Sequence, residues 1–227
     1  MKFRSLHSWD VRTTDAAEVQ RHLADQRTEA PLAPGWELVA GADVSYNLRS
    51  KTIYAGIVVI RVADGSVVER QGAVHETTFP YIPGFLSFRE APALLKAIKK
   101  LKTVPDVFMF DGQGYAHPRR FGLACHVGLW LNKPSLGCAK SVLCGKFGEL
   151  QTQEGSEAPL IDGADVIGSV VRTRTGVNPV YVSVGHKIDL RGAVRVVLAT
   201  RHGYRIPEPT RQADMYVNAL RRGDVAC

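Results

Sequence analysis

Three carboxylates stand where the sequence predicts that strands or helices begin or end. Asp43 lies late in a strand pattern over residues 36–46, Asp111 directly follows the apolar run 107–110, and Glu90 opens a helical pattern near 88–102. Carboxylate oxygens suit Mg²⁺, which polarises a phosphoryl group and helps to generate hydroxide. The three acids together favour metal-dependent hydrolysis of a phosphodiester.

Each acid also has a simpler interpretation. Asp43 could face solvent from its strand, although aspartate is disfavoured in strands, which favours a functional role. Glu90 could complete an S-x-x-E capping box with Ser87 at the start of its helix. Asp111 could begin a turn, but the polar stretch behind it, Asp-Gly-Gln-Gly-Tyr-Ala-His-Pro-Arg-Arg-Phe-Gly, indicates a site.

Two further side chains suit work on a phosphate. His117 could contact the phosphate or transfer a proton, or could be a histidine of a surface loop. Lys140 follows the apolar segment 136–139 and could neutralise charge on the scissile phosphate or position the water. An exposed lysine at a strand end is an equal alternative. Arg119 and Arg120 flank the site segment and could contact phosphates.

A rigid segment and a group of glycines suggest recognition of a base. Tyr81 stands in the run Pro80-Tyr81-Ile82-Pro83, where it could wedge into a base stack or could pack the loop onto the core. Glycine permits close approach of backbone to a flat ligand, although a turn is the commoner role of any one of them. The glycines near the site segments are Gly84, Gly112, Gly114, Gly122 and Gly137.

The surrounding pattern predicts an α/β domain that positions these residues. After a helix within residues 9–28, strands are expected at 36–46, 52–62 and 66–79, with a tight turn at 63–65. The helix at 88–102 and a strand at 106–110 follow, then a helix at 122–131 and a strand at 135–140. Residues 151–159 suggest a surface loop, before strands at 164–173 and 179–184 and helices at 189–201 and 210–222. A meander followed by alternating helices and strands predicts one mixed sheet flanked by helices, in a single domain over residues 1–227.

Composition restricts the class of protein. A net charge of +7 among 227 residues raises the expectation of a polyanionic partner such as nucleic acid. The four cysteines show no zinc-ligand spacing, so reduced thiols are expected. No apolar run is long enough to span a bilayer, and the N-terminus lacks the apolar region of a signal peptide. We therefore expect a cytoplasmic protein with no membrane partner.

Five motifs together resemble the endonuclease V family of the ribonuclease H-like superfamily. They are Gly-Ala-Asp-Val-Ser-Tyr at 41–46, Pro-Tyr-Ile-Pro-Gly-Phe-Leu-Ser-Phe-Arg-Glu at 80–90, the segment 111–124, Lys140, and Pro-Glu-Pro-Thr-Arg at 207–211. They run in the family's order over most of the chain. In the ribonuclease H-like fold the first and fourth strands are neighbours, so the resemblance implies that Asp43 and Asp111 converge on a metal.

The resemblance also implies a substrate and a reaction. It implies a Mg²⁺-dependent endonuclease, with Mn²⁺ as a substitute, that acts as a monomer on DNA containing deoxyinosine. The enzyme would cut the second phosphodiester bond 3′ to the lesion and leave 3′-hydroxyl and 5′-phosphate ends. Inosine-containing RNA is an alternative substrate. A ribonuclease H or junction resolvase, or a binder of inosine-containing nucleic acid without catalysis, are alternative functions.

The family's site residues carry over by position. Asp43, Asp111 and Glu90 would hold the metal, with His117 and Lys140 assisting at the phosphate. Asp214 stands where some members carry histidine and is a candidate outer ligand or a surface helix residue. The wedge and lesion pocket would comprise Pro80, Tyr81, Ile82, Pro83, Gly84, Leu86, Gly112, Gly114, Gly122, Leu123 and Gly137.

Overall fold

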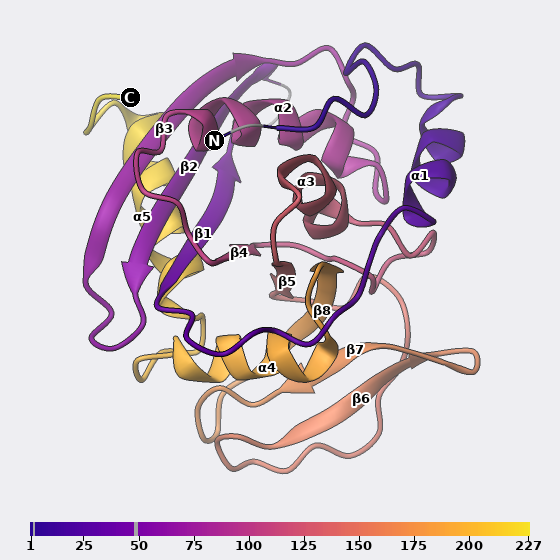
Figure 1. Cartoon of the computed structure of the whole chain (residues 1–227), viewed down its shortest axis with the longest axis vertical. Helices are drawn as coiled ribbons and strands as arrows, with labels where there is room; N and C mark the ends of the chain where they lie inside the picture. Colours follow the sequence, from indigo (N-terminus) through magenta and orange to yellow (C-terminus); the bar gives the residue numbers. More distant parts are fainter. Residues whose placement is uncertain (2, 48–49) are drawn as a thin grey trace.

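A computed structural model describes residues 1, 3–47 and 50–227 of the chain. The elements in chain order are α1 (Ala16–Ala24), β1 (Leu38–Ser45), β2 (Thr52–Arg61), β3 (Val67–Glu76), α2 (Leu86–Lys99), β4 (Val107–Phe110), α3 (Leu123–Leu131), β5 (Ser135–Ala139), β6 (Glu157–Asp162), β7 (Asp165–Val171), β8 (Val180–His186), α4 (Leu190–Ala199) and α5 (Glu208–Arg222) (Figure 1). Among the described residues, no helix is long and apolar enough to cross a membrane.

The described strands form one sheet in the order β3-β2-β1-β4-β5-β8-β7-β6. The hairpins β1–β2 and β2–β3 are antiparallel, whereas β4 pairs in parallel with both β1 and β5. This arrangement confirms the predicted mixed sheet, and it places the first and fourth strands side by side. The central strands are buried on both faces, which explains their nearly continuous apolar sequences.

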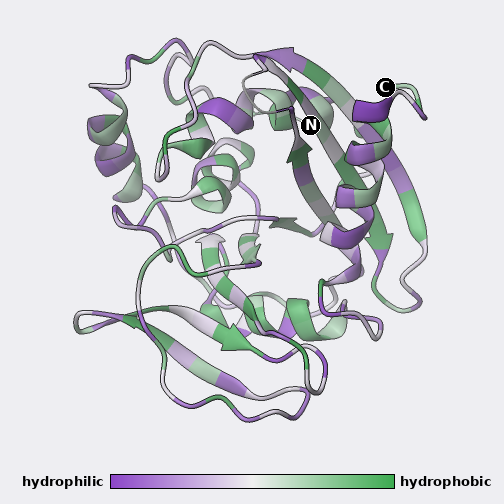
Figure 2. Cartoon of the chain, turned by 180° about the vertical axis from the view of Figure 1, so that it is seen from behind, coloured by the Kyte–Doolittle hydropathy of each residue, from purple (hydrophilic) through white to green (hydrophobic). Residues whose placement is uncertain are grey.

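Helices cover both faces of the sheet. Alternate residues of a strand point to opposite faces, so Ala40 and Phe108 pack with α2 and α3, while Val39 and Met109 pack with α4 and α5. Helix α5 packs against β1 and β2. It lies in front of these strands in Figure 2 and carries both hydrophilic and hydrophobic residues along its length. Helix α1 lies outside these layers and packs Leu23 against α3.

A close backbone contact fixes the position of α5. A Cβ atom on Gly41 would lie 2.0 Å from the carbonyl carbon of Pro209, at the start of α5. Only glycine lets the helix approach β1 this closely. The contact brings the second turn of α5 beside the end of β1, where Asp43 stands.

Two predictions of local structure were wrong. The capping box is absent, because α2 begins at Leu86 and the Ser87 hydroxyl instead bonds Nδ1 of His126, at 2.9 Å. The helix predicted within residues 9–28 is confirmed as α1, which spans 9 residues. The segment 151–159, interpreted as a loop, runs into β6, which forms an edge of the sheet, where its Pro159 is tolerated.

Candidate active site

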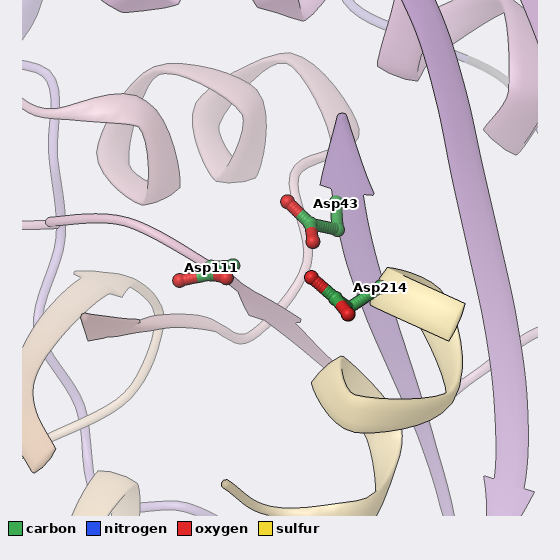
Figure 3. Close-up of side chains that lie close together, drawn as sticks. All are labelled: Asp43, Asp111 and Asp214. Carbon is green, nitrogen blue, oxygen red and sulfur yellow. The ribbon is translucent and has the colours of Figure 1, made fainter. Parts of the chain in front are cut away.

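Three aspartates converge at the end of β1 and β4. The parallel pairing of Ala42 with Phe110 places the next residues, Asp43 and Asp111, at the same height on neighbouring strands. Asp214 reaches them from α5, and one carboxylate oxygen of each residue lies within 4.8 Å of the others (Figure 3). A set of carboxylate oxygens on neighbouring elements suits a hard cation such as Mg²⁺ or Mn²⁺.

Lys140 lies against this cluster. It follows β5, the strand beside β4, and its Nζ atom lies 2.5 Å from a carboxylate oxygen of Asp111 and 3.5 Å from one of Asp214. Arg205 donates a hydrogen bond to the Lys140 carbonyl oxygen at 3.0 Å, which fixes the backbone at this point. The lysine therefore supplies a positive charge where negative charges gather.

Burial and repulsion from neighbouring carboxylates raise the pKa values of Asp43 and Asp111. Burial raises the pKa of Asp43 well above its usual range, and the neighbouring Asp111 carboxylate raises it further. Burial also raises the pKa of Asp111, and this rise is opposed by the Lys140 ammonium. A bound cation would reduce the repulsion within this set of acids, because it supplies positive charge between the carboxylates.

Glu90 lies in the wall of the same cavity but outside the group of three aspartates. Its side chain is buried on α2, and burial, together with repulsion from Asp111, raises its pKa to about 8. The sequence predicted Asp43, Asp111 and Glu90 as the metal set. Among the described residues, the structure groups the candidate outer ligand Asp214 with Asp43 and Asp111. The metal role of Glu90 stays a prediction.

A cavity of about 490 Å³ opens beside the cluster. Tyr81 lies at the cavity with 59 % of its surface exposed, so it does not pack its loop onto the core. The other predicted pocket residues in the lining are Pro83, Gly84, Leu86, Gly112, Gly122 and Leu123. Its volume lies within the range of sites that bind small molecules.

Sequence reasoning missed several residues of this lining. Val142 and Leu143 line the cavity on the side that follows Lys140, and both are partly exposed. Gln20 lines it from α1. None of these residues carries a chemical signature in the sequence, and only the position of residues 142 and 143 directly after Lys140 and Ser141 could have suggested them.

Four residues predicted for the wedge and pocket have other positions. Pro80 and Ile82 lie outside the cavity lining, as do Gly114 and Gly137. A Cβ atom on Gly114 would lie 2.1 Å from the carbonyl oxygen of Val184, and one on Gly137 would lie 2.4 Å from that of Gly112. These glycines permit close packing between backbone segments behind the cavity.

His117 is a buried, neutral histidine. Its Nε2 atom donates to the carbonyl oxygen of Gly84 at 2.9 Å, and its Nδ1 atom accepts from the backbone N–H of Arg119 at 3.1 Å. Burial lowers its pKa to about 4. Although His117 borders the cavity, both ring nitrogens are occupied, so the predicted phosphate contact or proton transfer does not match this geometry.

The two arginines of the same loop are also engaged by the protein. Arg119 donates to Gly84 and to Gln20, and its guanidinium group lies 4.1 Å from the centroid of the Phe85 ring. Arg120 bonds Asp162 at 2.8 Å and Asp165 at 3.1 Å in the β6–β7 hairpin. These contacts make both arginines structural supports of the loop.

Comparison with known proteins agrees with the fold. Residues 18–215 match the family model described as Endonuclease V. Endonuclease V of Myxococcus xanthus is 50 % identical over 218 residues, which cover 95 % of this chain and 92 % of the relative. The crystal structure of endonuclease V from Streptomyces avermitilis superposes with a TM-score of 0.90 at 40 % identity, covering 96 % of this chain and 97 % of that one.

A third relative was solved with nucleic acid. The Ciona intestinalis endonuclease V structure, in complex with a 24mer DNA containing an inosine followed by a ribo-adenosine, has a TM-score of 0.80 and 25 % identity. The superposition covers 93 % of this chain and 98 % of the Ciona intestinalis chain.

The mixed sheet and its clustered aspartates define a nuclease with a ribonuclease H-like fold, a hydrolase that acts on DNA. Within that class, the chain belongs to the endonuclease V family.

Proposed function

We propose that this chain is a Mg²⁺-dependent repair endonuclease for DNA containing deoxyinosine. It would hydrolyse the second phosphodiester bond 3′ to the lesion and leave a 3′-hydroxyl and a 5′-phosphate. The observation that carries the proposal is the cluster of Asp43, Asp111 and Asp214 beside a cavity with an exposed tyrosine at its edge.

The aspartates would hold the cation, with Asp43 and Asp111 as principal ligands and Asp214 as the third. When bound, Mg²⁺ would polarise the scissile phosphate and lower the pKa of an attacking water. Lys140 would stabilise the negative charge that develops on the phosphate, because its ammonium already lies among the acids. Glu90, with a pKa of about 8, could give or take a proton at its carboxyl group near neutral pH.

Tyr81 and the cavity would select the lesion. An exposed aromatic ring at the cavity edge can fill the gap left when a base leaves the stack. Hypoxanthine carries a carbonyl where adenine has an amino group, so an N–H donor in the cavity favours it over adenine. It lacks the exocyclic amine of guanine, so a close wall at that edge excludes guanine. A mispaired base also leaves the stack at a lower cost.

The test is cleavage of matched oligonucleotides that carry deoxyinosine, inosine in RNA, or adenine at one position, with Mg²⁺ or with EDTA. We expect a single nick one nucleotide beyond the deoxyinosine, absent with adenine and absent with EDTA. The ratio of cleavage on the DNA and RNA substrates shows which sugar the enzyme prefers, since a cavity that contacts the base edge alone does not distinguish ribose from deoxyribose. Cleavage that ignores the inosine would contradict the proposal, and binding without cleavage would favour a non-catalytic reader.

A further inference from the structure

Helix α1 buries a glutamine in its apolar stripe. The buried residues of this helix are Ala16, Gln20 and Leu23, which lie on one face at helical spacing. Gln20 is 1 % exposed and borders the cavity of the active site. A buried amide is costly unless it is fully hydrogen-bonded, so its partners indicate its role.

The Gln20 amide joins two loops that both contribute to the cavity lining. Its Nε2 atom donates to the carbonyl oxygen of Gly84 at 3.0 Å and to that of Phe121 at 3.1 Å. Its Oε1 atom accepts from Nε of Arg119 at 2.5 Å. Gly84 belongs to the wedge loop, residues 80–85, whereas Phe121 and Arg119 belong to the glycine loop, residues 111–122.

The carbonyl oxygen of Gly84 is the point where these contacts meet. It accepts from Gln20, from Nε2 of His117 at 2.9 Å and from a terminal nitrogen of Arg119 at 2.6 Å. Gly84 has φ of +81°, a backbone conformation that favours glycine, and its carbonyl direction is set by that conformation. Three donors from two separate elements therefore determine where the wedge loop lies.

We propose that Gln20 is a positioning residue that sets the separation between the wedge loop and the glycine loop. Through this separation it would control how Tyr81 meets a duplex. This inference rests on the proposed function of the site. Gln20 does not touch the aspartate cluster, so its contribution would fall on lesion recognition in duplex DNA rather than on the chemical step.

Packing of α1 does not by itself require the amide. Leu23 already packs with Phe121, Cys125 and Leu129, and Ala16 packs with Phe79 and Phe88. An unbranched apolar side chain at position 20 would fill the same space and favour the helix equally well. The hydrogen bonds of Gln20, rather than its volume, are what link the two loops.

The experiment compares Gln20→Met with the wild-type protein on deoxyinosine in a duplex and in a single strand. A single strand has no partner or continuous stack to open, so it depends less on the wedge loop. We expect kcat/KM on the duplex to fall about tenfold through KM, as for the loss of one or two hydrogen bonds. On the single strand we expect a fall of less than about threefold, with unchanged Mn²⁺ dependence.

Two further variants complete the design. Gln20→Glu keeps an acceptor for Arg119 but turns a carboxylate oxygen toward two carbonyl oxygens. It should therefore show the same duplex-selective loss. This variant tests the positioning role if Gln20→Met does not fold. Gln26→Met is the matched control, because Gln26 follows the same helix and its side chain contacts His22 away from the cavity. The control should cleave both substrates like the wild type.

Equal losses on duplex and single strand, or no loss on either, would overturn the positioning role of Gln20. A fall in kcat with altered Mn²⁺ dependence would also overturn it, because the effect would then lie at the metal cluster. Failure of the wild-type protein to nick the deoxyinosine strand would instead refute the proposed function, which keeps the two outcomes distinct.

Discussion

Burial of His117 as a neutral imidazole predicts a specific loss of stability in acid. The folded protein lowers the pKa of His117 from 6.5 to about 4, through burial. Between these two values the unfolded chain binds a proton that the folded chain does not. The free energy of unfolding therefore falls as the pH falls below about 6.5, and the loss is complete near pH 4.

The size of this effect follows from the two pKa values. Between pH 7 and pH 5 the unequal proton uptake lowers the free energy of unfolding by roughly 2 kcal/mol. The buried carboxylates act in the opposite sense, because the pKa values of Asp43 and Asp111 are raised in the folded state. Protonation of these acids stabilises the fold as the pH falls, so the total pH dependence alone does not isolate the histidine.

Replacement of His117 by glutamine isolates it. The glutamine amide can donate to the Gly84 carbonyl but cannot titrate, while every other group stays common to both proteins. Urea unfolding followed by tryptophan fluorescence, in EDTA, should show that His117→Gln loses about 2 kcal/mol less than the wild type between pH 7 and pH 5. Parallel pH dependences of the two proteins would refute the assignment of His117 as a buried neutral residue.

Three other substitutions test the site. Tyr81→Ala should leave the thermal midpoint within a few degrees of the wild type, because the ring is 59 % exposed, but it should reduce discrimination of inosine from adenine in duplex cleavage. Lys140→Met should lower kcat on the deoxyinosine strand by about 100-fold while Mn²⁺ still binds; an unchanged kcat would return the lysine to a surface role. Asp214→Ala should weaken Mn²⁺ binding in calorimetry about tenfold or more, whereas equal affinity in the two proteins would remove Asp214 from the metal set.

Local patterns in the sequence predicted most of the fold. The helical spacing of apolar residues located α2, α3 and α5, and the short apolar run 107–110 located β4. The strand β6 was missed because it is an edge strand with alternating exposed residues and a proline. Strand β6 forms because it pairs with β7. A local sequence pattern does not reveal pairing with another strand.

The site was predictable where its residues follow buried strands. Asp43 and Asp111 could be identified from their own sequence segments, because a carboxylate in or beside an apolar strand is unusual. Asp214 could not be identified in this way, since its position beside the other two aspartates depends on the close contact of Pro209 with Gly41. The hydrogen bond of His117 was not predictable for the same reason, because its partner Gly84 lies 33 residues away.

The central claim is that Asp43, Asp111 and Asp214 hold a divalent cation. The most direct test is anomalous diffraction from crystals grown with Mn²⁺, on the wild-type protein and on Asp43→Asn. We expect an anomalous peak within coordination distance of the carboxylates of Asp43 and Asp111 in the wild type, and a weakened or absent peak in the variant. A wild-type structure with Mn²⁺ bound elsewhere, or with these aspartates paired to Lys140 and no metal beside them, would contradict it.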